Sequence, residues 1–141
     1  MNTNLKKAKE LLETEGYTCV LYNGEVMLTS NLRGVKPLAD WYTDGLKFQG
    51  YFAADRVVGK AAAFLYVVLG VECVYARVIS EPALSVLQNN NIPVLYDNLV
   101  AAIKNRAGTG FCPMETAVLD IDSPDEAVAA VLNKLKQMEN M

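Results

Sequence analysis

The chain has 141 residues, of which 52% are hydrophobic and 21% are charged, and its formal net charge is −3. This length and balance are typical of a single globular domain with a sizeable core. The acidic charge and the dispersed cations oppose attraction to a phosphate backbone, so we expect no nucleic acid partner. Histidine is absent, and the cysteines Cys19, Cys73 and Cys112 are widely spaced. We therefore expect reduced thiols, no metal and no cofactor.

Residues 1–16 lack the apolar core of a signal peptide. The longest apolar run, residues 61–71, is far shorter than the roughly 20 residues that a membrane-spanning helix needs. We expect a cytoplasmic protein with no membrane partner.

The first third of the chain predicts a helix and then a hairpin. Leu5, Ala8, Leu11 and Leu12 recur at helical spacing over residues 4–15, with Thr3 or Asn4 as the cap and Gly16 at the end. Residues 17–22 and 25–30 are β-rich and flank Asn23-Gly24, a pair that favours a type I′ turn. The pattern of residues 31–50 indicates an irregular insertion or flap around a short helix.

The remaining chain alternates between helices and strands. Residues 57–69 are apolar and rich in alanine, which predicts a buried central helix. The sequence then predicts a strand over 72–79, a helix over 82–88 and a strand over 92–96. These are followed by a helix over 98–105, which Asp97 caps, and a loop at 107–110. A helix begins near Cys112-Pro113, and Ser123-Pro124-Asp125-Glu126 opens the last helix as a capping box. The predicted order is α-β-β-α-β-α-β-α-α.

This order indicates a single α/β domain over residues 1–141, with three α-β-α layers and a mixed sheet that opens with a β-hairpin. Residues 107–141 form a C-terminal extension of this domain. The element order resembles that of the cytidine deaminase superfamily over residues 4–105. The resemblance also rests on Glu81-Pro82 after a strand and on residues 55–63 at the place of the first zinc motif.

The resemblance implies a fold but excludes its usual chemistry. Lys60 stands where a deaminase has its histidine ligand, and Ala62 stands where it has the catalytic glutamate. Ala83 and Val86 replace the two cysteine ligands. Without zinc to activate water or a glutamate to move its proton, hydrolytic deamination by that mechanism is excluded. The segments at 59–63, 80–84 and 112–115 look like those of an uncharacterised zinc-free family with this fold. Because the function of that family is unknown, this resemblance implies a fold and leaves the activity open.

Polar residues remain at the predicted helix starts. Gly59-Lys60 could bind an anion through backbone N–H groups and the ammonium, or Lys60 could pair with Asp55 or Glu81 as a structural ion pair. It is not a P-loop, because Ala54 and Ala61 replace required residues.

Three further groups have both a functional and a structural interpretation. Cys112 could be a nucleophile at a helix start or a small core residue. Glu115 and Glu81 could act together as carboxylates or be unrelated. The aromatic residues near the irregular segment could cover a site or pack it onto the sheet; they are Trp41, Tyr42, Phe48, Tyr51 and Phe52.

Three hypotheses follow for the function. The first is a zinc-free pocket that binds a nucleotide or other anionic small molecule, lined by Asp55, Gly59, Lys60, Ser80, Glu81, Cys112 and Glu115. The second is an enzyme of another class that uses Cys112 or a carboxylate. The third is a structural or regulatory module that works as a homodimer or larger homo-oligomer through exposed apolar surface.

Overall fold

The computed structural model describes residues 2–104, 108, 110 and 112–139. Its sheet has five strands in the order β2-β1-β3-β4-β5. Their bounds are β1 (Cys19–Tyr22), β2 (Met27–Ser30), β3 (Phe52–Val58), β4 (Cys73–Ser80) and β5 (Val94–Val100). β1 pairs antiparallel with β2 and β3, whereas β3, β4 and β5 run parallel. The predicted α/β class and the mixed sheet with an opening hairpin are confirmed.

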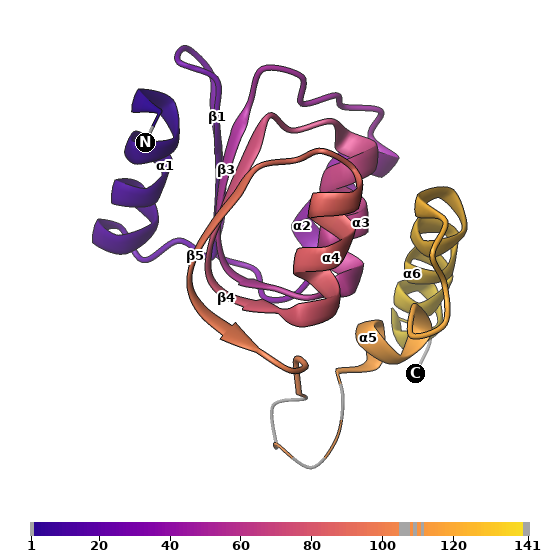
Figure 1. Cartoon of the computed structure of the whole chain (residues 1–141). Helices are drawn as coiled ribbons and strands as arrows, with labels where there is room; N and C mark the ends of the chain where they lie inside the picture. The colour runs from indigo at the N-terminus through magenta and orange to yellow at the C-terminus, as the bar shows by residue number, and fades with distance from the viewer. Residues whose placement is uncertain (1, 105–107, 109, 111, 140–141) are drawn as a thin grey trace.

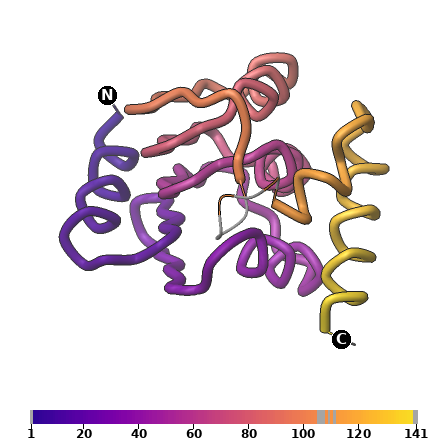
Figure 2. The backbone as a smooth tube through the Cα atoms, turned by 90° about the horizontal axis from the view of Figure 1, so that it is seen from below, coloured from indigo at the N-terminus to yellow at the C-terminus, as the bar shows by residue number. Residues whose placement is uncertain are grey.

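Helices cover both faces of the sheet (Figure 1). α1 (Thr3–Thr14) lies on one face, and α2 (Lys36–Thr43), α3 (Lys60–Leu69) and α4 (Glu81–Asn89) lie on the other. α5 (Pro113–Ala117) and α6 (Pro124–Glu139) follow, and α6 packs against α3 from outside. Figure 2 shows α1 and α6 on opposite sides of the molecule.

The larger part of the core lies between the sheet and α3. Consecutive residues of this helix from Ala61 to Tyr66 are all at most 5% exposed, so the predicted central helix is confirmed as buried on nearly every side. A smaller cluster under α1 includes Leu5, Leu12 and Tyr75. In the described part of the chain, no helix combines the length and the apolar character that crossing a membrane requires.

The start of the predicted central helix was wrong, because residues 52–58 form the middle strand of the sheet. The Ala-Ala-Asp-Arg segment of β3 has little intrinsic β-propensity, so its sequence does not indicate a strand. Pairing with β1 on one side and β4 on the other overrides that preference. α3 begins only after Gly59.

The predicted helix over 98–105 was also wrong within the described residues. β5 continues to Val100 in parallel pairing with β4, and residues 101–104 are not helical. Asp97 caps no helix and instead accepts a hydrogen bond of 2.6 Å from the Tyr75 hydroxyl. Residues 105, 107 and 109 of the predicted helix and loop lie outside the described part of the chain.

Two local predictions near the N-terminus need correction. Tyr22 pairs with Met27, so the hairpin loop has four residues and is not a two-residue type I′ turn. The Asn23 side chain accepts hydrogen bonds from Glu25 N and Val26 N, which stabilises this wider loop. The cap of α1 is Asn2, whose side chain accepts from Asn4 N and Leu5 N.

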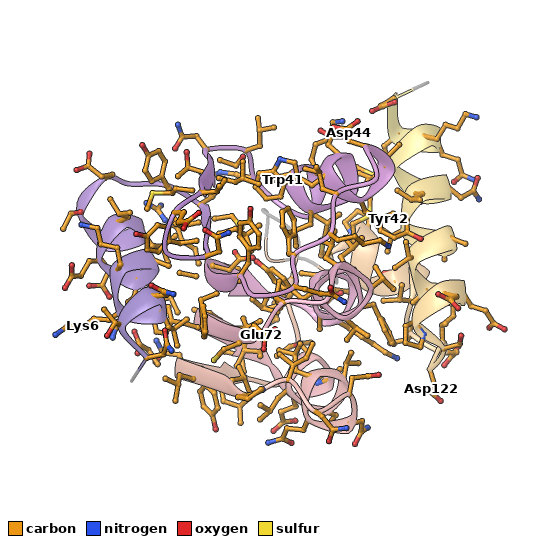
Figure 3. All side chains as sticks on the ribbon, turned by 90° about the horizontal axis from the view of Figure 1, so that it is seen from above. Lys6, Trp41, Tyr42, Asp44, Glu72 and Asp122 are labelled. Atoms are coloured by element: carbon orange, nitrogen blue, oxygen red, sulfur yellow. The ribbon has the colours of Figure 1, made fainter. Side chains whose placement is uncertain are left out.

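The aromatic residues near the irregular segment pack the fold together. Trp41 and Tyr42 lie on α2, far from Lys6 on α1 (Figure 3). Phe48 is 1% exposed and makes edge contacts with the rings of Trp41 and Tyr51, at 5.8 and 5.0 Å between centroids. The packing interpretation is therefore the one that the structure supports.

Candidate functional site

Four of the seven predicted site residues surround one cavity of about 640 Å³: Asp55, Gly59, Cys112 and Glu115. Lys60 instead lines a neighbouring hollow of about 310 Å³ between α3 and α4. Ser80 and Glu81 line neither of the two. The structure thus brings together the end of β3, the start of α3 and the segment around α5, but not the start of α4.

The cavity wall combines segments that are distant in sequence. β1 and β3 contribute Cys19 and Asp55, and the start of α3 contributes Ala61 and Ala62. Three other segments complete the wall. They are Leu32–Lys36 before and at the start of α2, Cys112–Glu115 around the start of α5, and Leu135 and Met138 near the end of α6. The cavity therefore exists only because the C-terminal helices pack onto α3.

Glu115 caps α3 from 55 residues away. Its carboxylate accepts a 2.6 Å hydrogen bond from Lys60 N and a 2.9 Å bond from Ala61 N. These are N–H groups that the first turn of a helix leaves without internal partners. Burial raises the pKa of Glu115 above its usual 4.5, while the two N–H groups and the Lys60 charge oppose the shift.

Gly59 permits this close approach. A Cβ at position 59 would lie 2.6 Å from Glu115 Cδ, a separation that packed atoms do not tolerate. Its backbone is extended, with φ −96° and ψ −179°, so left-handed geometry does not explain the glycine. The anion that the sequence predicted at Gly59-Lys60 is thus supplied by the chain itself.

Lys60 makes neither of the ion pairs considered for it among the described residues. Its Nζ donates a 3.1 Å hydrogen bond to the carbonyl of Leu119, just after α5. The ammonium also lies 5.9 Å from the centroid of the Phe64 ring. Together with Glu115, this contact fastens the C-terminal segment to α3.

A chain of three groups, the buried Cys19 and Tyr66 and the half-buried Asp55, reaches the cavity from the sheet. The Tyr66 hydroxyl donates a 2.6 Å hydrogen bond to Asp55 Oδ2 and lies 3.4 Å from Cys19 Sγ. Asp55 Oδ1 also accepts a 3.3 Å bond from Val57 N. Cys19 and Asp55 line the cavity, and Tyr66 lies behind them in α3.

Burial favours the neutral form of every group in this network. It raises the pKa of Asp55 from 3.8 to about 7, although hydrogen bonds from Tyr66 and from the Val57 and Arg56 N–H groups act in the opposite direction. It also raises the pKa of Cys19 and of Tyr66 well above their usual values. Asp55 is therefore the group in this network whose charge changes near neutral pH.

Sequence reasoning missed Tyr66 and the mouth of the cavity. A tyrosine in an otherwise apolar, buried helix needs a partner for its hydroxyl, and that requirement was the available signal. Arg33 and Lys104 line the cavity and are exposed, so they mark its open side. No sequence pattern relates these two cations, which are 71 residues apart.

The other predicted site residues have structural positions. Ser80 is completely buried and its hydroxyl accepts from Ala83 N at 3.2 Å, which caps α4. Glu81 is exposed in the first turn of α4. Cys112 lines the cavity directly before α5, but that helix has only five residues and offers a weak macrodipole. Within the described residues, no cluster of three or more Cys, Asp or Glu side chains could hold a metal ion.

Residues 7–135 match the family TM1506, a domain of unknown function also named DUF1893. The chain belongs to the DUF1893 family. Its fold is similar to the crystal structure of a DUF1893 family protein (TM1506) from Thermotoga maritima, with a TM-score of 0.88 and 29% sequence identity over 95% of this chain and 92% of that one. No curated protein matches the chain. Membership in an uncharacterised family, which the sequence predicted, is therefore confirmed, and the family assigns no activity.

Proposed function

We propose that this DUF1893 domain binds a nucleotide or a similar anionic small molecule in the cavity beside α3. The observation that carries the proposal is the cavity itself, with a polar network at its wall and two exposed cations at its mouth. Its volume of about 640 Å³ falls within the range of roughly 300–1,000 Å³ typical of small-molecule sites.

The charges around the cavity favour a ligand with an anionic end. Lys36 lines the cavity but already forms ion pairs, because its Nζ lies 2.8 Å from Asp40 and 3.6 Å from Glu139. Arg33 and Lys104 appear in no ion pair within the described residues. A phosphate or carboxylate at the mouth would gain from both cations.

We further propose that the fold is deaminase-like and works without zinc. Parallel strands β3 and β4 each lead directly into a helix, α3 and α4, as the resemblance implies. Ala62 and Ala83 are buried at these helix starts and have no atom that ligates a metal. The proposed function is therefore binding and not hydrolytic deamination.

A thermal denaturation series with a panel of nucleoside monophosphates tests the binding proposal. At a ligand concentration one hundred times Kd, the stabilisation is about 2.7 kcal/mol, which raises Tm by roughly 5–10 °C for a domain of this size. The double variant Arg33→Ala/Lys104→Ala should lose most of this shift. Lys6→Ala/Lys7→Ala removes the same charge from exposed positions on α1 and should keep it. No shift with any nucleotide, or an equal loss in both variants, contradicts the proposal.

A second candidate function, self-association, is favoured by the outer strand β5. Leu95, Tyr96 and Leu99 are each 42% exposed, and the strand contains no Lys, Arg or Pro that would discourage pairing at an open edge. A second copy of the chain could extend the sheet through this edge as a symmetric dimer. Sedimentation velocity should then show a dimer that Leu99→Lys converts to a monomer, and a monomeric starting protein refutes this candidate.

A further inference from the structure

The polar groups of the cavity wall differ in how much of their hydrogen-bonding capacity is already used within the protein. The Thr18 hydroxyl has its one proton shared between the carbonyls of Ser30 and Leu32, which lie 2.9 and 2.7 Å from its oxygen. Both Glu115 oxygens accept from the first turn of α3. Asp55 differs, because Tyr66 and the Val57 and Arg56 N–H groups occupy at most three acceptor positions, and an ionised carboxylate offers about four.

The environment of Asp55 determines which ligand groups suit it. Tyr66 and Val57 N are both donors toward this carboxylate, so they hold it in position as an acceptor. Burial makes its negative charge costly, and a ligand that supplies further N–H donors would offset that cost. A ligand group that can only accept hydrogen bonds would face another acceptor.

From this geometry we infer that the buried end of the ligand is an amidine-type group whose two adjacent N–H bonds point at Asp55. A planar pair of N–H donors matches a carboxylate in the same bidentate manner as arginine does. Amidinium and guanidinium ions carry such a pair, and so does the guanine base through its N1–H and 2-amino groups. This inference rests on the proposed binding function and specifies its ligand.

Asp55 and the two exposed cations, which line the same cavity, then contact different parts of one molecule. The amidine-type group contacts Asp55, and the apolar body lies among residues such as Ala61, Ala62 and Leu135. An anionic group reaches Arg33 and Lys104 at the mouth. Guanosine monophosphate has the N–H pair and the anionic group, joined by the flat purine ring and the ribose, whereas inosine monophosphate lacks only the 2-amino group.

Titration calorimetry on the full chain compares two matched probe pairs. Guanosine monophosphate should bind at least about tenfold more tightly than inosine monophosphate, and benzamidine should bind at least about tenfold more tightly than neutral benzamide. Asp55→Asn replaces one acceptor by a donor at constant size and should abolish both preferences. Asp44→Asn makes the same chemical change at an exposed position outside the cavity and should preserve them. Circular dichroism confirms that each variant is folded.

The outcomes separate this inference from the function on which it rests. If both monophosphates bind equally well and Asp55→Asn changes nothing, the amidine inference is overturned and nucleotide binding stands. If benzamidine binds through Asp55 but no monophosphate binds, the inference stands and the nucleotide proposal fails. If none of the four probes binds, both are refuted.

Discussion

The contact between Gly59 and Glu115 predicts that one substitution will have different effects in two backgrounds. In the wild type, Gly59→Ala adds a methyl group that would lie 2.6 Å from Glu115 Cδ. The carboxylate must then leave the first turn of α3, and its bonds to Lys60 N and Ala61 N are lost. In a Glu115→Ala background, the space is already empty.

The structure sets the size of both effects. Hydrogen bonds to a charged acceptor contribute about 1.5–3 kcal/mol each, and part of this is returned when the displaced carboxylate regains water. We expect Gly59→Ala to cost about 2–3 kcal/mol in the wild type. Without Glu115, the extended backbone at position 59 can accommodate alanine. Alanine reduces the conformational entropy of the unfolded chain, which stabilises the protein by about 0.4–1 kcal/mol, but it is a poorer N-cap residue than glycine, which costs a similar amount. The net effect there should lie within about 1 kcal/mol of zero.

Urea unfolding of the four proteins in this double-mutant cycle measures the coupling. Far-UV circular dichroism at 25 °C follows the transition, and the slope with urea checks that each protein unfolds in two states. The difference between these two effects gives an expected coupling free energy of about 1–4 kcal/mol. If Gly59→Ala has the same cost in both backgrounds, the glycine is not there for the carboxylate, and our account of the α3 cap is wrong.

Three further predictions concern the hydrogen bond between Tyr66 and Asp55, the charge of Asp55 and one helix cap. Tyr66→Phe removes the hydroxyl that donates to Asp55 and should lower the free energy of unfolding by about 1–3 kcal/mol. The loss should be larger above pH 7, where the carboxylate is charged, and urea unfolding at pH 5 and pH 8.5 measures the difference. Burial raises the pKa of Asp55 from 3.8 to about 7, so between these pH values the native state holds a proton that the unfolded state has released. The free energy of unfolding should therefore fall by about 2–4 kcal/mol as the pH rises across this window. An Asp55→Asn variant that shows the same dependence on pH contradicts the assignment. Ser80→Ala leaves Ala83 N without its buried acceptor and should lower the free energy of unfolding by about 0.5–2 kcal/mol; an unchanged value would mean that Ser80 does not cap α4.

Local sequence signals were sufficient where neighbouring residues carry the structure. The apolar face of α1, the alanine-rich run of α3 and the Ser-Pro start of α6 each indicate a helix, because the spacing and the capping chemistry lie within a few residues. The same signals failed for β3 and for the end of β5. Both segments are strands because a neighbouring strand pairs with them, and that pairing partner is not visible in local sequence.

The sequence by itself predicted the α/β class and the opening hairpin, and it named Asp55, Gly59, Cys112 and Glu115 as candidate site residues. Only the tertiary structure decided how these residues relate. It showed that Glu115 is the anion at the start of α3 and that Tyr66 donates a hydrogen bond to Asp55. It also showed that Arg33 and Lys104 line the same cavity as Asp55 and Glu115. The physical reason is that local sequence encodes capping and apolar periodicity, whereas the cavity depends on segments from β1 to the end of α6 being packed against each other.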